Sequence, residues 1–175
     1  MKFVSLIILL LCGCSIGGQD SYSDHPTFEV AFSPNEGATQ LVVKSINEAK
    51  QSIKLAAYGF TSKPVAEALI AAHKRGVVVQ AVLDKSNNTA KYSAATFLSN
   101  MGVATRINSE YSIMHDKYII IDGENIELGS FNYSKAAEEK NAENVLYIRH
   151  NHALAKSYAD NWQKLWDEAE EYKKK

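Results

Sequence analysis

Cysteine is almost absent from this 175-residue sequence, and both copies, Cys12 and Cys14, lie near its beginning. The rest of the chain therefore lacks the thiols of a disulfide framework and the thiolate ligands of a zinc site. Long hydrophobic runs are also scarce. The apolar stretch from Phe3 to Leu11 is too short to cross a bilayer as a stable helix. The length suits a single domain that is held by an ordinary hydrophobic core.

An excess of charge is missing as well. The 19 Lys and Arg residues nearly balance the 20 Asp and Glu residues, which leaves a net charge of −1 at pH 7. This balance argues against a strongly basic platform for nucleic acid. No internal repeat is present, so the chain carries one copy of any site that it contains.

The N-terminal segment has the pattern of an export signal, because Lys2 precedes the short apolar run. Residues 1–14 are predicted to be a signal peptide, and the sequence Leu11-Cys12-Gly13-Cys14 resembles a bacterial lipoprotein box with Cys14 as the lipidated residue. Ordinary cleavage near Gly17 or Gly18 is the alternative. Residues 15–26 are polar and predict a flexible tether, and residues 27–175 are predicted to form the folded domain. The protein is thus expected to be exported to the periplasm, either free or anchored to the membrane as a lipoprotein.

The most informative pattern is His-x-Lys, four residues, Asp, six residues, Gly-Ser-x-Asn. Its residues are His115, Lys117, Asp122, Gly129, Ser130 and Asn132. The stretch from Met114 to Ile121 predicts a buried central strand, on which His115 and Lys117 share a face. Asp122-Gly123 then predicts a tight hairpin turn, followed by a short return strand. The hairpin brings Ser130 and Asn132 close to His115 and Lys117.

These groups suit the cleavage of a phosphodiester. Lys117 offers a cation, and Ser130 and Asn132 offer neutral donors for the non-bridging oxygens, whose charge grows in the transition state. His115 can attack phosphorus at neutral pH and can also move protons. Gly129 is expected to let the phosphate approach the backbone closely.

The other histidines give no comparable pattern. His150 and His152 are spaced so that a strand could present both to a metal, but no cysteine is near and the acidic residues stand at no recognisable interval. They are interpreted as a solvated strand end. No metal and no cofactor are expected.

Strands and helices alternate along the rest of the chain, which predicts an α/β sandwich with a mixed β-sheet. An amino-terminal helix dipole just after Asn132 is expected to face the phosphate. The final helix is amphipathic, and its aromatic stripe is interpreted as core or dimer packing. The predicted strands span 28–32, 52–58, 77–83, 103–107, 114–121, 126–128 and 145–149, and the predicted helices span 38–50, 61–76, 92–100, 134–139 and 153–173.

The motif resembles the signature of the phospholipase D superfamily, with every defined position filled. The chain from Phe28 to Lys173 resembles the small bacterial endonucleases of that superfamily, which carry one motif per chain and act as homodimers. The resemblance implies a phospholipase D-like α-β-α sandwich. Further stretches that support it are Phe32-Ser33-Pro34, Ala57-Tyr58-Gly59-Phe60-Thr61, Lys74-Arg75-Gly76-Val77 and Asn141-Ala142-Glu143-Asn144.

The resemblance also implies roles. His115 of one subunit attacks phosphorus, and His115 of the partner subunit protonates the leaving oxygen. Lys117, Ser130 and Asn132 hold the phosphate, and Glu143 orients the imidazole. Asp122 belongs to the catalytic signature, although its position favours a turn residue. One motif supplies one histidine, so a symmetric homodimer with a composite active site is expected.

The substrate is left open by these residues. The leading hypothesis is a metal-independent, non-specific endonuclease that acts on DNA or RNA. The alternative is a phospholipase D that acts on membrane phospholipid, which the possible lipid anchor and the near-neutral charge favour. A non-catalytic binding module is disfavoured by the intact His115.

Overall fold

The computed structural model describes residues 25–88 and 94–173, which form one mixed sheet between helices. The sheet has eight strands in the order β1-β7-β6-β5-β2-β3-β4-β8. β2 pairs in parallel with β3, and β3 in parallel with β4, whereas the remaining pairs are antiparallel. The strands are β1 (Thr27–Ser33), β2 (Ser52–Ala57), β3 (Val78–Asp84), β4 (Ala104–Asn108), β5 (Lys117–Ile121), β6 (Asn125–Gly129), β7 (Glu143–Arg149) and β8 (Glu170–Glu171).

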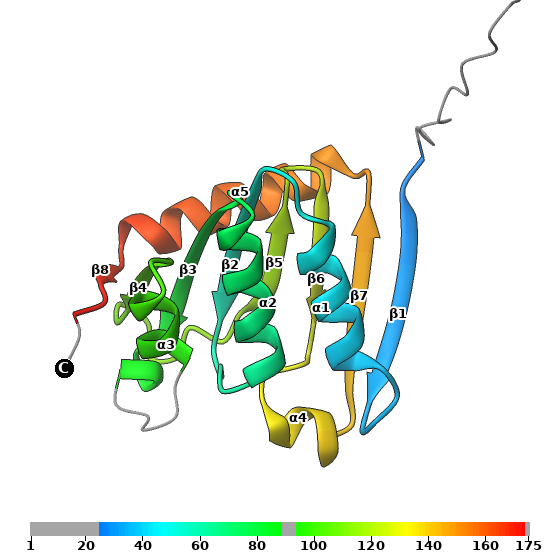
Figure 1. Cartoon of the computed structure of the whole chain (residues 1–175), viewed down its shortest axis with the longest axis horizontal. Coiled ribbons are helices and arrows are strands. Elements are labelled where there is room, and N and C mark those ends of the chain that lie inside the picture. The colour runs from blue at the N-terminus through cyan, green and yellow to red at the C-terminus, as the bar shows by residue number, and fades with distance from the viewer. Residues whose placement is uncertain (1–24, 89–93, 174–175) are drawn as a thin grey trace, which may run out of the picture.

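Helices cover both faces of the sheet (Figure 1). Helices α1 (Ala38–Glu48), α2 (Lys63–Lys74) and α3 (Ala94–Asn100) lie on one face, and α5 (His152–Asp167) lies on the other. The short helix α4 (Lys135–Glu139) lies at one end of the strands. The predicted α-β-α sandwich with a mixed sheet is confirmed. None of the helices within the described ranges combines the length and the apolar character that crossing a membrane requires.

Strand β5 lies in the middle of the sheet and is buried on both sides, as its apolar sequence predicts. Ile119 and Ile121 pack in the core beneath α1 and α2, whereas Tyr118 and Ile120 pack in the core beneath α5. This alternation is the period of a strand, and it places each motif residue on a defined side of the sheet.

The final helix is shorter than predicted. The expectation of a helix from residue 153 to 173 is wrong at its C-terminal end, because α5 ends at Asp167 and β8 follows. Tyr172 explains the difference: its backbone N–H donates to Thr105 and its side chain is buried in the opposite core. The aromatic stripe of α5 is confirmed as core, since Trp162 is fully buried and stacks on Trp166.

Helix α1 begins at residue 38 as predicted but ends earlier than predicted. Gly37 in the left-handed region precedes it, and no side chain of the 33–36 turn caps it. The helix ends at Glu48 rather than Lys50, because the Asp122 carboxylate accepts the backbone N–H groups that follow. Predictions for residues 1–24 and 92–93 lie outside the described residues.

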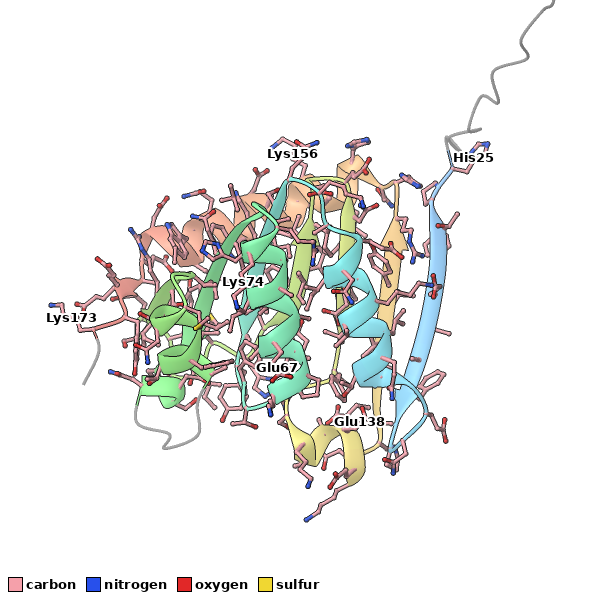
Figure 2. The ribbon with its side chains drawn as sticks, viewed as in Figure 1. His25, Glu67, Lys74, Glu138, Lys156 and Lys173 are labelled. Carbon is pink, nitrogen blue, oxygen red and sulfur yellow. The ribbon has the colours of Figure 1, made fainter. Side chains whose placement is uncertain are left out.

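Strand β1 runs along the edge of the sheet and has a defined direction. Thr27 pairs with Arg149, and Ser33 pairs with Glu143, so β1 starts at one end of the sheet and finishes at the other. The Arg149 guanidinium holds this edge by bonding Glu29 of β1 and Glu48 of α1. Figure 2 shows the two ends: His25 lies beside the start of β1, and Glu138 of α4 lies at the opposite end.

Candidate active site

Three consecutive antiparallel strands bring the motif to one end of the sheet. His115 precedes β5, Ser130 follows β6, and Glu143 begins β7, so all three lie at the same end of the sheet. An open cavity of about 510 Å³ lies there. It is lined by His115, Asp116, Lys117, Tyr118, Leu128, Gly129, Ser130, Asn132, Glu143, Asn144 and Tyr158.

His115 is an exposed side chain just before β5. Strand β5 begins at Lys117 rather than before His115, yet both side chains line the cavity as predicted. The Tyr58 ring contacts the imidazole with 4.7 Å between ring centroids. The Tyr58 backbone N–H donates to the Asp116 carbonyl at 2.9 Å, which fixes the chain between His115 and Lys117. Tyr58 thus contacts the imidazole through its ring and the adjacent backbone through its N–H, while His115 stays exposed.

Lys117 is buried at the base of the cavity. Its Nζ donates to the His115 carbonyl at 2.5 Å and lies 5.3 Å from the centre of the Tyr58 ring. Burial lowers the pKa of Lys117, and the charges of Asp116 and Glu143 oppose that shift. Burial also raises the pKa of Asp116, against the charges of Lys117 and His115. The cavity therefore contains a poorly solvated cation, which an anionic phosphate would stabilise.

The Gly129-Ser130 step is fixed by β7. A Cβ atom on Gly129 would clash with the Asn144 carbonyl oxygen, so the close approach that needs glycine is to β7 rather than to a phosphate. The Ser130 N–H donates to Asn144 O at 3.2 Å, and Ser130 Oγ accepts the Asn144 N–H at 3.1 Å. Because Oγ accepts in that bond, its own proton remains free to donate into the cavity.

Asn132 lines the cavity and packs against Gly59. A Cβ atom on Gly59 would lie 3.3 Å from Asn132 Oδ1, so a larger residue there would press on the amide. Asn132 Oδ1 is buried and has no hydrogen-bond partner among residues 25–88 and 94–173. The structure thus brings Ser130 and Asn132 to the same cavity as His115 and Lys117.

Glu143 lines the cavity, and its carboxylate accepts a hydrogen bond from Asn141 Nδ2 at 3.0 Å. Within the described part of the chain no hydrogen bond joins Glu143 to His115. Its role in orienting the imidazole therefore stays a prediction.

Asp122 does not reach the cavity. It lies at the other end of β5, with φ 54, and its carboxylate accepts the N–H groups of Lys50, Gln51 and Ser52 at 2.8 Å each. These contacts join the β5–β6 turn to the start of β2. They support the turn interpretation of Asp122 rather than direct participation in catalysis.

Helix α4 does not direct its N-terminus at the cavity. Ser134 caps the helix by accepting the Ala137 N–H at 3.2 Å. Ser134 and Lys135 line a separate depression of about 390 Å³ between α1, α2 and α4. The expected contribution of this helix dipole to phosphate binding is therefore not seen.

His150 and His152 lie at the far end of the sheet, beside the Glu124 carboxylate at 3.7 and 3.6 Å. The turn after β5 supplies this acid, which no sequence interval indicated. Across the described ranges no three His, Cys, Asp or Glu side chains are grouped as metal ligands. That no metal is required stays a prediction.

Several cavity residues were not anticipated from the sequence, and three of them have ionisable side chains. Asp116 stands at a variable position of the motif, Tyr118 lies on the α5 side of β5, and Tyr158 arrives from α5. Tyr118 and Tyr158 contact each other edge to face at 4.9 Å and form an aromatic wall. The period of β5 and the stripe of α5 contained this signal, but only the packing of α5 reveals that they meet at the cavity.

Comparisons with known proteins agree with this architecture. The family described as "Cardiolipin synthase, PLD-like domain" matches residues 42–166. The crystal structure of Nuc from Salmonella typhimurium, described as a phospholipase D family member, is 41% identical, with a TM-score of 0.83 over 86% of this chain and 100% of that one.

Two curated relatives are also similar. A phospholipase D from Rickettsia typhi is 40% identical over 131 residues, which is 75% of this chain and 64% of the relative. A mitochondrial cardiolipin hydrolase from Xenopus laevis is 32% identical over 69% of this chain and 57% of the relative. The chain therefore spans less than two thirds of the length of these relatives. The family match and the likeness to Nuc show that this chain belongs to the phospholipase D superfamily, in its Nuc-like branch.

Proposed function

We propose that this protein is an exported phosphodiesterase that acts through a phosphohistidine on His115, needs no metal ion or other cofactor, and cleaves nucleic acid. The observation that carries the proposal is the convergence of His115, Lys117, Ser130 and Asn132 on one open cavity. These side chains supply a nucleophile, a cation and two neutral donors, which is the set that phosphoryl transfer needs.

In the first step, one imidazole nitrogen of His115 forms a bond to phosphorus as the bond from phosphorus to the leaving oxygen breaks. Lys117, Ser130 and Asn132 stabilise the charge that grows on the non-bridging oxygens. A proton passes to the leaving oxygen from a general acid. In the second step, a water loses a proton to the same group, attacks phosphorus and releases His115.

The general acid is proposed to be His115 of the partner subunit in a homodimer. An in-line displacement needs its acid on the side of phosphorus opposite to the nucleophile. His115 is the one histidine that lines the described cavity, so a second copy of the chain is the simplest source of another imidazole.

An exposed apolar strip on β1 supports this assembly. Phe28, Val30 and Phe32 are 62%, 59% and 48% exposed and alternate along the strand. Their register partners on β7 are Ile148, Leu146 and Asn144, so the strip lies on the α5 side of the sheet and leads to the cavity at Asn144. Helix α5 packs against β2 to β6 and leaves this part of the sheet open.

A second copy that covers this strip would bury apolar surface and approach the cavity at once. Sedimentation equilibrium should show a dimer for the wild type and a monomer for the Phe28→Ser, Val30→Ser double variant, with loss of turnover. Phe97→Ser is the matched control, because Phe97 is 43% exposed on α3 at the other face. A fully active monomer would refute the shared site.

Nucleic acid is the favoured substrate because His115 is exposed at the end of the sheet, where an extended polymer can pass. Phospholipid is the second candidate. The names of the relatives from Rickettsia typhi and Xenopus laevis, together with the exposed apolar strip beside the cavity, favour it.

The decisive experiment is plasmid nicking in excess EDTA by the purified soluble domain, with the His115→Asn variant beside it. Nicking by the wild type alone would establish a metal-free nuclease that uses His115. A folded dimer that leaves the plasmid intact but releases headgroups from phospholipid vesicles would establish the second candidate. Inactivity on both substrates and on bis(4-nitrophenyl) phosphate would overturn the proposed chemistry.

A further inference from the structure

A carboxyl group is buried in the core beside the segment that carries Ser130 and Asn132. Glu127 of β6 is 1% exposed and pairs with Ile119 on one side and Tyr147 on the other, both of which belong to the core beneath α1 and α2. It is not among the residues that line the cavity, and no step of the proposed chemistry uses it. A carboxyl group in an apolar core is costly unless it has a partner.

The partner is Tyr133. Its hydroxyl donates to Glu127 Oε2 at 2.7 Å, and the tyrosine side chain is fully buried. Burial raises the pKa of Glu127 to about 8, against the hydrogen bond from Tyr133, so the group is largely neutral at neutral pH. The pair is therefore a hydrogen-bonded anchor inside the core rather than an ion pair.

Tyr133 is also the point at which two chain segments join. Its carbonyl oxygen accepts the N–H groups of Thr61 and Ser62 at 2.8 Å each, and it forms an isolated bridge with Phe60. The Phe60 and Tyr133 rings also meet edge to face at 5.8 Å. Movement of Tyr133 would therefore displace residues 59–62 as well.

Both segments position Asn132. It directly precedes Tyr133, its carbonyl oxygen accepts the Ser134 N–H at 2.7 Å, and its side-chain amide packs on Gly59. Strand β6 ends at Gly129, two residues after Glu127, and Ser130 follows directly. The Tyr133–Glu127 hydrogen bond thus links the core to the segments that carry Ser130 and Asn132, the two neutral donors of the cavity.

We infer that Glu127 and Tyr133 are positioning residues, whose hydrogen bond in the core holds Asn132 in the geometry that binds the phosphate. The inference rests on the proposed phosphodiesterase function and extends it to residues that never touch the substrate. A shift of a donor by less than an ångström weakens its contact with the transition state, because electrostatic stabilisation depends on preorganisation.

The test is a double-mutant cycle between Tyr133→Phe and Asn132→Ala, with bis(4-nitrophenyl) phosphate as substrate. Tyr133→Phe alone should lower kcat about tenfold, less than the roughly 10²-fold that follows deletion of a donor outright. In the Asn132→Ala background the same change should alter kcat less than about twofold, because the group that it positions is gone. Glu127→Gln should retain activity, since the glutamine carbonyl can accept the Tyr133 hydroxyl.

Tyr147→Phe is the matched control. Tyr147 is also fully buried, lies on the same core face and donates its hydroxyl to a glutamate, Glu48, at 3.0 Å. Its loss should lower the melting temperature and leave kcat unchanged. Independent effects of Tyr133→Phe and Asn132→Ala, or an equal fall in kcat for Tyr147→Phe, would reduce Glu127 and Tyr133 to ordinary core residues.

A binding measurement separates this inference from the proposed function. Inorganic phosphate can be titrated into each protein while the Asn132 side-chain amide resonance is followed by NMR. Tyr133→Phe should weaken phosphate binding about tenfold, and Tyr147→Phe should not. Equal phosphate affinity in all three proteins would overturn the positioning role, whereas a wild type that binds phosphate but cleaves no ester would overturn the phosphodiesterase proposal alone.

Discussion

Replacement of Glu127 by glutamine should change how stability depends on pH. The pKa of this carboxyl is about 8 in the fold against 4.5 for an exposed glutamate. Between these values the folded state binds a proton that the unfolded state has lost, so the free energy of unfolding falls as pH rises. The loss begins near pH 4.5 and is complete above about pH 8.

The size of the effect follows from that interval. At 1.36 kcal/mol per pH unit, the step from 4.5 to about 8 corresponds to roughly 5 kcal/mol for this fully buried group. Glutamine does not titrate, so the Glu127→Gln variant should lack this component. The difference in unfolding free energy between variant and wild type should grow toward that value from pH 5 to pH 9.

Urea unfolding at a series of pH values measures this difference. Other titrating groups are the same in both proteins and cancel, whereas any altered hydrogen bonding of the amide adds a constant offset. A difference that stays flat between pH 5 and pH 9 would refute the argument, because it would mean that Glu127 ionises in the fold much as it does in the unfolded chain.

Three further predictions concern stability. Asp122→Ala should lower the free energy of unfolding, measured in urea, by about 3 kcal/mol, because three backbone N–H groups lose a charged acceptor. The kcat of the folded protein should stay unchanged. A fall in kcat of folded protein would instead restore a catalytic role for Asp122. Gly129→Ala should disrupt β6–β7 pairing, because the new Cβ would clash with the Asn144 carbonyl oxygen. It should lower the melting temperature far more than Gly123→Ala, which costs only the roughly 1–2 kcal/mol of a positive φ. Similar melting temperatures for the two variants would contradict the clash. Trp162→Phe should lower the free energy of unfolding, measured in urea, by about 2–3 kcal/mol, because the hydrogen bond to the Leu55 carbonyl is lost. A decrease below about 0.5 kcal/mol, the usual range of surface substitutions, would contradict a stabilising role for that bond.

The local part of the site could be predicted from the sequence because it is encoded in a hairpin. The alternation of β5 and the Asp122-Gly123 turn fix where His115, Lys117 and Ser130 point, and the strands of a hairpin pair with each other. Residues that arrive from distant segments were harder. Tyr158 reaches the cavity only because α5 crosses the sheet at a particular angle, which no periodicity specifies.

Glu127 shows why burial of a polar residue is difficult to predict. The sequence Ile126-Glu127-Leu128 alternates apolar and polar residues, which is the pattern of a strand with one face in water. Both faces of β6 are in fact covered, and the polar residue is satisfied by a tyrosine six positions later. Likewise, the C-terminal residues continue a helical pattern, but pairing of β8 with β4 outweighs helix propensity there.

The direction of β1 determines where the N-terminal side of the chain joins the domain relative to the cavity. Its first residue lies at the end of the sheet opposite the cavity, about 20 Å away at the rise of a strand. Any attachment through the N-terminal side of Thr27 would therefore join the domain at the end of the sheet farthest from His115 and Lys117. The catalytic end and the point of attachment are thus separated by the full length of a strand.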